Sequence, residues 1–382
     1  MRLDRRKLRV LRRGLRRPRA LWNLAKIKLL LPVLQRSDRV TITPAMLDIE
    51  PTAKCNIRCK YCQVTYWDRS AKVKNLTYEQ FVQIVDQFPH VLQIKLQGMG
   101  EPFLNHDFFR MVAYADRKGI TVRTFSNATL LSEELAERIV ESPLAELTIS
   151  VDAATKETFE RIRSGADWDR VQENIHRLVR ARRELGNGRD PLITIWMVAT
   201  TENIGEFPEL VRIAKHLGVD RLDLQNHLNF WGKEDYQEKM QRYSINREDT
   251  PTHYRPDVDR ILNEARRVAK EIGMRMTIHT GNTLHAGDKC SWPWTSAYIS
   301  ADGFVVPCCV VANPEVMNFG NLFQDTFSSI QNREKYKALR RSFMEGTPPK
   351  MCDGCYLCPK ESGLVTIPAP PRAAAASRIG AL

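Results

Sequence analysis

Apolar positions along the chain alternate between two kinds of spacing. Short apolar or β-branched runs, each typical of a strand, recur at 46–49, 91–96, 121–125, 146–151, 192–198 and 221–224. The stretches between them have the three-to-four-residue spacing of amphipathic helices. This alternation predicts six βα units and a parallel sheet, arranged either as an open doubly wound sheet or as a complete or partial barrel.

Three glycines mark the expected junctions between a helix and the next strand. Gly119, Gly218 and Gly273 each stand where helical periodicity stops and a β-type run follows. Glycine tolerates the left-handed conformation that closes a helix, so these positions fit the predicted alternation. In either sheet arrangement, ligands bind at the C-terminal ends of the strands.

Charge is concentrated at the N-terminus. The chain has 58 Lys and Arg against 45 Asp and Glu, a net charge of +13. Residues 1–40 hold 14 basic and two acidic residues, so the remaining 342 carry 44 basic and 43 acidic groups and are nearly neutral. This distribution argues against a nucleic-acid-binding body, and no specific nucleic-acid partner is expected.

Neither a membrane span nor a secretory signal is expected. The apolar segment 21–34 is interrupted by Lys26 and Lys28 and is too short to cross a bilayer, and no cleavage site follows it. We therefore expect a cytoplasmic protein. In a reducing compartment its nine cysteines are metal ligands or reactive thiols rather than disulfide partners.

The first cysteine group follows directly on the first predicted strand. Cys55, Cys59 and Cys62 have the spacing C-x-x-x-C-x-x-C. Three thiolates can hold three irons of a 4Fe-4S cluster and leave the fourth iron open for a ligand. A zinc site completed by a remote histidine, or three unrelated cysteines, are the alternatives.

This spacing, with the aromatic Tyr61 just before the last cysteine, resembles the signature of the radical S-adenosylmethionine (SAM) enzymes. The resemblance covers about residues 46–360. It implies that the open iron binds SAM and that one-electron cleavage yields a 5'-deoxyadenosyl radical, which abstracts a hydrogen atom from a substrate. An external electron donor of the flavodoxin or ferredoxin type is then required.

Several further residues match the family's SAM-binding positions. The segment 97–102, with Gly98, Gly100 and Glu101, resembles the glycine-rich GEP motif, in which the glycines allow close approach and the glutamate accepts a hydrogen bond from the SAM amino group. Ser126 and Asn127 resemble the ribose-contacting pair, although Ala128 replaces the more usual glycine. The remaining SAM contacts that the resemblance implies are Ser150, Asp152 and Arg163.

The second cysteine group resembles the SPASM or twitch extension of the same superfamily, which carries auxiliary iron-sulfur clusters. A β-hairpin with Asp302-Gly303 at its turn is expected between the first two of these cysteines. A complete SPASM domain has seven cysteines and two clusters, whereas this segment has six. One auxiliary 4Fe-4S cluster is therefore expected, with zinc as the alternative; its candidate ligands are Cys290, Cys308, Cys352 and either Cys355 or Cys358.

That ligand count leaves Cys309 without a metal role. Either it is a small buried apolar residue, the usual fate of a free cysteine, or it faces the radical site. In the second case it resembles the cysteine that donates a hydrogen atom in epimerases of this superfamily, and it is our candidate catalytic residue.

These inferences give the fold class α/β: a partial (β/α)6 TIM-type barrel with a small C-terminal SPASM/twitch-like iron-sulfur domain. The expected boundaries are a basic extension at 1–45, the barrel at 46–284, the auxiliary domain at 285–363 and a disordered Pro/Ala-rich tail at 364–382. The basic extension fits a helix on an anionic membrane at the inner surface, a helix on an acidic partner, or a solvated segment.

For function, the resemblance implies net oxidation or epimerisation of a sugar, an aminocyclitol or another small molecule. Gln225, Asn226 and His227 follow the sixth predicted strand and are candidate substrate contacts, unless they belong to a polar loop. A peptide maturase is the first alternative, but the strand-poor N-terminus does not fit the usual peptide-recognition domain. An iron-sulfur protein without enzymatic activity, serving electron transfer or regulation, is the second.

Overall fold

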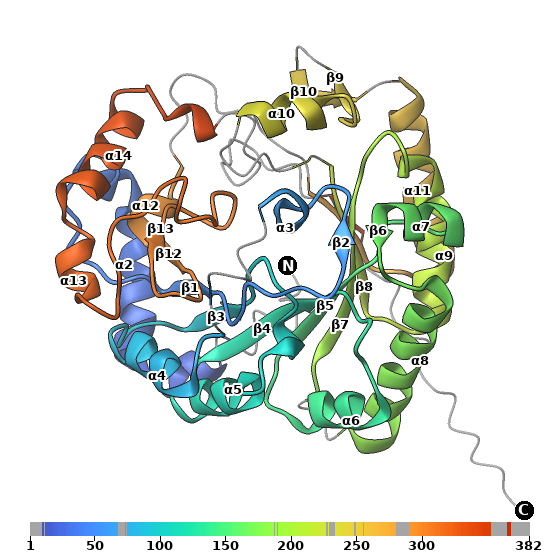
Figure 1. The fold of residues 1–382 in the computed structure, drawn as a ribbon, viewed down its shortest axis with the longest axis horizontal. Coiled ribbons are helices and arrows are strands. Elements are labelled where there is room, and N and C mark those ends of the chain that lie inside the picture. The colour runs from blue at the N-terminus through green and yellow to red at the C-terminus, as the bar shows by residue number, and fades with distance from the viewer. Residues whose placement is uncertain are drawn as a thin grey trace, which may run out of the picture.

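The fold is a curved, mostly parallel sheet whose outer face is covered by helices (Figure 1). It was obtained as a computed structural model, which describes residues 10, 12–67, 73, 75–186, 188, 190–226, 228, 234–247, 250–254, 256–279, 290–352 and 365–367. Within these ranges the main sheet has the strand order β13-β12-β1-β3-β4-β5-β7-β8-β11-β14. The strands are β1 Met46–Ile49, β3 Gln93–Leu96, β4 Thr121–Ser126, β5 Glu146–Ser150, β7 Leu192–Val198, β8 Arg221–Gln225, β11 Met276–His279, β12 Ser296–Ile299, β13 Val305–Val306 and β14 Val365–Ile367.

Helices alternate with these strands, as the periodicity predicts. Gly119, Gly218 and Gly273 all adopt positive φ at the ends of helices, which confirms the predicted junctions. The α-helices are α2 Pro18–Leu34, α3 Gln63–Tyr66, α4 Tyr78–Asp86, α5 Phe108–Arg117, α6 Glu133–Glu141, α7 Lys156–Ile162, α8 Trp168–Leu185, α9 Phe207–Leu217, α10 Glu234–Gln241, α11 Pro256–Ile272, α12 Trp292–Thr295, α13 Phe327–Ile330 and α14 Glu334–Met344. Short 3-10 turns are η1 Pro102–Leu104, η2 Ile204–Glu206 and η3 Lys350–Cys352, and two small ribbons pair β2 Arg58–Cys59 with β6 Arg163–Ser164 and β9 Asn246–Arg247 with β10 Thr250–Tyr254.

The α/β partial-barrel fold is confirmed, but the prediction of six parallel strands was too low. In the described residues the parallel ladder runs from β12 through β1, β3, β4, β5, β7 and β8 to β11, which is eight strands. The additional strand β11 has only four residues, and β12 was assigned to the C-terminal hairpin. That hairpin is present, since β12 pairs antiparallel with β13, but its first strand also joins the barrel by pairing with β1.

The expectation that the chain is disordered from residue 364 is wrong for 365–367. These residues form β14, which pairs antiparallel with β11 in the register Met276↔Ile367. The β-branched sequence Val-Thr-Ile suits an edge strand, and β11 offers it a free edge. The rest of the tail lies outside the described residues.

The two faces of the barrel strands differ in chemistry. Residues such as Leu47, Ile94 and Leu147 pack on the helices in the apolar core. The alternate positions face inward and carry ion pairs: Lys95 with Asp48 at 2.6 Å, and Arg221 with Glu146 at 3.0 Å and with Asp223 at 2.9 Å. The imidazole of His279 also lies 3.4 Å from Asp223. We call these six residues the inner ion pairs.

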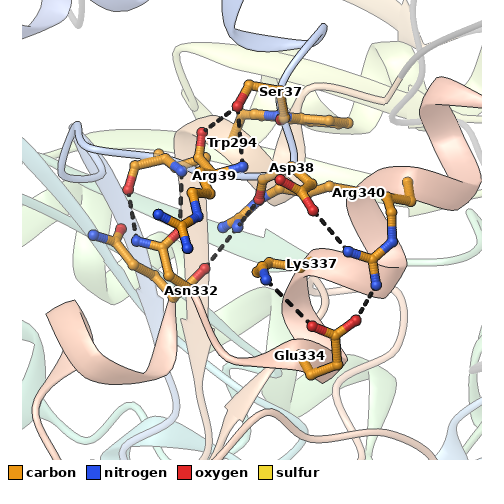
Figure 2. Close-up of polar contacts among 11 residues, drawn as sticks. Ser37, Asp38, Arg39, Trp294, Asn332, Glu334, Lys337 and Arg340 are labelled. Atoms are coloured by element: carbon orange, nitrogen blue, oxygen red, sulfur yellow. Dashed lines mark hydrogen bonds and ion pairs between the residues drawn. The ribbon is translucent and has the colours of Figure 1, made fainter.

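Residues 37–40, which we call the strap, connect the N-terminal helix to the C-terminal part of the chain (Figure 2). The indole of Trp294 donates to the carbonyl of Ser37 at 2.9 Å, and Arg340 donates to that of Asp38 at 2.9 Å. Asn332 exchanges two hydrogen bonds with the backbone of Val40.

Within the described chain, no helix combines the length and apolarity that a bilayer crossing requires.

Candidate functional site

The first cysteine group lies at the C-terminal ends of the barrel strands. The loop that carries it leaves β1, and its ribbon β2 pairs with β6, so that Cys59 stands directly across from Arg163. Arg163 also directs Nη1 toward the Cys59 sulfur at 3.8 Å, and Asn127 directs Nδ2 toward the Cys55 sulfur at 3.9 Å. Both sulfurs therefore face a donor that would stabilise a negative charge.

The three thiols of this group are close enough to influence one another. Burial raises the pKa of Cys59 to about 11 and that of Cys62 to about 12, and in both cases neighbouring thiols of the group add to the effect. Burial likewise raises the pKa of Cys55. Iron would displace these protons on binding.

This donor set fits a 4Fe-4S cluster. In the part of the chain that the structure describes, no three His, Cys, Asp or Glu side chains converge closely enough to hold a single metal ion. A four-iron cluster is wider than one ion, and its thiolate ligands bind different irons rather than one point. Three free, adjacent thiols with donors toward two of them are the arrangement such a cluster needs.

Glu101 is buried beside this loop and accepts several hydrogen bonds. Its Oε1 accepts from the Ser126 hydroxyl at 2.9 Å, and its Oε2 accepts from the Asn127 backbone N–H at 2.8 Å. Burial raises the pKa of Glu101 to about 7, although these hydrogen bonds act in the opposite direction. Oε1 also accepts from the Phe103 backbone N–H at 3.4 Å. The structure thus brings Glu101, Ser126 and Asn127 together, and Oε2 keeps a further lone pair.

Ala128, which stands where the family more usually has glycine, adopts a backbone conformation that glycine favours. Ala128 is buried and has φ of +59°, a left-handed conformation that a non-glycine residue seldom adopts. The side-chain oxygen of Asn127 accepts from the N–H and the hydroxyl of Thr129, which closes a tight turn, and its Nδ2 donates to Asn56 at 3.0 Å. The turn therefore fixes Asn127 against the cysteine loop.

Asp152 and Arg163 form a buried ion pair on the other side of the same loop. Arg163 Nε lies 2.8 Å from Asp152 Oδ2, and Asp152 Oδ1 accepts from the backbone N–H of Val198. Burial alone would lower the pKa of Arg163, but the charges of Asp152 and Cys59 raise it above its ordinary value. Ser150 ends strand β5 with a half-buried side chain.

Tyr61 is held by residues that the sequence analysis did not identify. Its hydroxyl donates to Glu202, which also pairs with Lys60 at 2.8 Å, and its ring packs on Tyr243 with centroids 5.1 Å apart. Burial and the hydrogen bond to Glu202 raise the pKa of Tyr61. Glu202 lies in the loop between β7 and η2, and no motif or spacing in the sequence indicates its contact with Tyr61.

Gly98 and Gly100 lie where the glycine-rich segment approaches the cysteine loop so closely that a Cβ would not fit. A Cβ at Gly100 would lie 2.3 Å from the carbonyl oxygen of Lys54 and 2.4 Å from that of Thr52, both in the backbone of the cysteine loop. A Cβ at Gly98 would lie 2.1 Å from Cγ of Glu50. The glycine-rich segment and the cysteine loop are therefore packed directly on each other.

Glu50 is a second residue that the sequence did not reveal. It is fully buried, and its two carboxylate oxygens accept from Met99 N–H and from Ala301 N–H, each at 3.0 Å. One side chain thus joins the cysteine loop, the glycine-rich segment and the C-terminal hairpin. The only indication in the sequence is an acidic residue directly after the first predicted strand.

In the second group, Cys290 lies in the apolar core and Cys352 packs against that core, and within the described residues neither they nor Cys308 is part of a disulfide. Tyr336, which stacks on Phe319 at 3.9 Å between centroids, is near two of them. Burial raises the pKa of Tyr336 to about 12, against the charge of Arg340 and with a contribution from Cys308 and Cys290. Cys355 and Cys358 lie outside the described residues.

Cys309 lies toward the barrel rather than toward Tyr336. It packs with Met99 and Phe304 around the buried Tyr298. Burial raises the pKa of the Cys309 thiol to about 12, and Lys95 and Asp48 are the nearest charges that modify it. The thiol therefore neighbours both the glycine-rich segment and the inner ion pairs.

The substrate candidates that the structure describes at the end of β8 are buried, whereas a position at the barrel mouth predicts exposed side chains. Asn226 is fully buried and Gln225 nearly so. Gln225 shares the strand face of Asp223 and pairs in register with His279. His227 lies outside the described residues.

Two regions of the chain match models of known protein families. A family model described as the radical SAM superfamily matches residues 49–224, and one described as an iron-sulfur cluster-binding domain, SPASM, matches residues 290–358. The chain is 31% identical over 189 residues to a Pyrococcus furiosus protein named tungsten-containing aldehyde ferredoxin oxidoreductase cofactor-modifying protein. That match covers 48% of the chain and 51% of the relative, so the chain spans about half the length of this relative.

Two other matches extend over more of the chain. A Methanosarcina barkeri protein named AdoMet-dependent heme synthase is 24% identical over 343 residues, covering 84% of the chain and 89% of the relative. The crystal structure of Streptococcus suis SuiB bound to the precursor peptide SuiA superposes with a TM-score of 0.61 at 17% identity, covering 88% of the chain and 75% of that structure, which shows a shared fold. The chain therefore belongs to the radical SAM superfamily with a C-terminal SPASM iron-sulfur domain, and its cofactors are SAM, the radical SAM 4Fe-4S cluster and at least one auxiliary SPASM cluster.

Proposed function

We propose that this chain is a radical SAM enzyme that removes a hydrogen atom from a small polar molecule. The observation that carries the proposal is the arrangement of donors and acceptors around the first cysteine group, where Arg163, Asn127 and Glu101 meet at the strand ends. When bound, the cluster and SAM supply one-electron chemistry that ends in abstraction of a hydrogen atom from a substrate.

The chain's own residues hold and orient these cofactors. Cys55, Cys59 and Cys62 bind the irons, and Asn127 and Arg163 direct N–H groups toward two of the sulfurs. Glu101, with a lone pair left on Oε2, accepts from the SAM amino group. The other proposed SAM contacts are Tyr61, Gly98, Gly100, Ser126, Ser150 and Asp152.

The inner ion pairs support a small polar substrate. Asp48, Lys95, Asp223 and His279 lie on the inner face of the strands, whereas Glu146 and Arg221 begin β5 and β8 at the ends away from the cysteine loop. A sugar or an aminocyclitol can exchange hydrogen bonds with such groups, and desolvated charged partners make those bonds strong. A peptide is the competing substrate class, since SuiB was solved with its precursor peptide.

Cys309 decides between two outcomes after hydrogen abstraction. If its thiol returns a hydrogen atom to the opposite face of the substrate, the result is epimerisation, and one electron and one proton from an external donor must restore the thiol. If the substrate radical instead loses an electron and a proton, the result is oxidation. The position of Cys309 beside Met99 and Lys95 supports the first course.

Anaerobic reconstitution tests the enzymatic proposal. We expect about eight irons per chain and, on reduction, cleavage of SAM to 5'-deoxyadenosine, which implies one barrel cluster and one auxiliary cluster. A protein that holds about four irons, or zinc, and does not cleave SAM would instead be a non-enzymatic metal protein. An external donor of the flavodoxin or ferredoxin type serves as reductant.

Product analysis with deuterated solvent tests the role of Cys309. The wild-type enzyme should place one solvent-derived deuterium in the product, because the thiol proton exchanges with solvent. The Cys309→Ala variant should still form 5'-deoxyadenosine and take the substrate hydrogen, but release no epimerised product. Unchanged turnover in that variant would remove Cys309 from the mechanism and leave it a buried thiol.

A further inference from the structure

Helix α2 presents one face that the rest of the described chain does not cover. Trp22, Leu29 and Val33 are exposed to 62%, 74% and 61%, and Leu30 to 44%. Together with Arg19, Lys26 and Arg36, the first three follow a spacing of three and four residues along the helix and just past its end, which places them in one row. We call Arg19, Trp22, Lys26, Leu29, Val33 and Arg36 the apolar-basic stripe.

The charges along this stripe are all of one sign. Arg19 and Arg36 are exposed, and Lys26 lies over the Trp22 ring with its nitrogen 5.9 Å from the centroid. No Asp or Glu occurs between residues 12 and 37. An apolar face with this rim of cations is complementary to a surface that is negatively charged and apolar just beneath.

The helix is fixed to the barrel and is not a free tail. Ala20, Asn23 and Ile27 form its buried face, and Asn23 donates to the carbonyl of Thr43 at 2.9 Å. Before the helix, Arg17 donates to the carbonyl of Pro89 at 2.8 Å. After it, the strap is held by the C-terminal helices (Figure 2). The stripe is therefore a rigid surface of the folded protein.

We propose that the apolar-basic stripe of α2 binds an anionic lipid membrane with the helix lying in the plane of the interface. Trp22, Leu29 and Val33 would enter the boundary between headgroups and acyl chains, and Arg19, Lys26 and Arg36 would meet the phosphates. Tryptophan is favoured at this depth because its ring is apolar and its N–H is polar. A bilayer offers a continuous apolar layer directly beneath its charged headgroups, which matches this arrangement of side chains and favours a lipid surface.

The position of α2 also defines how the enzyme would face the membrane. The polar contacts of this region with the barrel are made to segments that precede β1, β3 and β4, at the N-terminal ends of these strands. The cysteine loop lies at the opposite, C-terminal ends of the strands. Membrane binding through the stripe would leave that end open to substrate and to the electron donor.

Vesicle flotation with the full chain tests the proposal. The protein should float with vesicles of equal parts phosphatidylcholine and phosphatidylglycerol, and remain in solution with phosphatidylcholine alone. Arg19→Gln with Arg36→Gln should weaken binding about 25-fold, because each cation near such a surface contributes about a fivefold factor. Raising the salt to about 1 M, where the Debye length is about 3 Å, should release the wild-type protein.

The controls remove the same groups from other surfaces. Arg170→Gln with Lys270→Gln deletes two exposed charges elsewhere and should leave binding unchanged. Leu29→Ser with Val33→Ser should reduce binding at least tenfold, whereas Leu185→Ser, at another exposed leucine, should not. All of these side chains are partly or fully exposed, so melting curves should match the wild type; salt release of the wild-type protein supplies a test that uses no variant.

Three outcomes would overturn the proposal. The wild-type protein does not float with anionic vesicles, or it floats equally with neutral ones, or the control pair Arg170→Gln/Lys270→Gln loses as much binding as the stripe pair. Retention on immobilised polyglutamate without vesicle binding would assign the stripe to an acidic protein instead.

Discussion

The two cysteine groups are built in different ways. The first is built within the barrel segment, where Asn127 and Arg163 lie beside the loop of Cys55 and Cys59 and are 72 and 104 residues from their partners in the chain. The second lies beside Tyr336 and Arg340, and Arg340 is fixed by a strap 302 residues away in the chain. The polar contacts to the first group's sulfurs thus come from within the barrel segment, whereas the second group lies where the N-terminal strap meets the C-terminal part of the chain.

Removing one ligand from each group should give the largest and most distinct effects. Cys59→Ser should lose about four irons per chain and all SAM cleavage, because a cluster with only two protein ligands left is not retained. Cys290→Ser should also lose about four irons but keep SAM cleavage. Iron analysis and 5'-deoxyadenosine formation distinguish the two. If Cys290→Ser abolished cleavage as well, the groups would not be independent.

The packing of the glycine-rich segment on the first group can be broken with one methyl group. Gly100→Ala would place Cβ 2.3 Å from a backbone oxygen of the cysteine loop, so the loop must shift. We expect loss of at least a hundredfold in SAM cleavage, with the auxiliary cluster retained. Gly205→Ala is the matched control, because a Cβ there meets nothing within 4 Å. Equal activity of the two variants would contradict this close packing.

How far the sequence predicts these sites follows from the same contrast. The six strands at 46–224 and the three glycine junctions are encoded by local periodicity, and the structure has them all. The sequence also predicts that Glu101 lies near Ser126 and Asn127, because the C-terminal ends of parallel strands lie along one edge of the sheet. Their roles in binding SAM remain predictions.

What the sequence did not reveal depends on long-range contacts. Glu50 joins Met99 to Ala301, and the strap joins Asp38 to Arg340, through side chains whose partners are far apart in the chain. Strand β12 was recognised as part of a hairpin, but its pairing with β1 has no local signal. Periodicity describes each element alone and does not specify which distant element it meets.

Arg340 tests whether the strap supports the second group. Its buried guanidinium donates to the carbonyls of Asp38, Pro293 and Gln331. Arg340→Met leaves these acceptors with fewer donors and should lower the free energy of unfolding by about 3 kcal/mol, with loss of auxiliary iron before barrel iron on heating. The control is Arg341→Met, a more exposed ion pair with Asp38, which should cost about 1 kcal/mol or less. Similar losses in both variants would mean that burial of Arg340 is not what matters.

The smallest effect is expected at Ala128, beside the first group. Its left-handed backbone costs a non-glycine residue about 1 kcal/mol or more, so Ala128→Gly relieves strain. Against this, the variant loses a buried methyl group and gains freedom in the unfolded chain, each about 0.8 kcal/mol. The net change in unfolding free energy should therefore stay within about 1 kcal/mol, with iron and SAM cleavage unchanged. Ala153→Gly, at an equally buried alanine that is not among the positive-φ residues, has no strain to relieve and should be destabilised by about 1.5 kcal/mol. If the two variants were equally destabilised, the turn at Ala128 would be unstrained and its alanine would need another explanation.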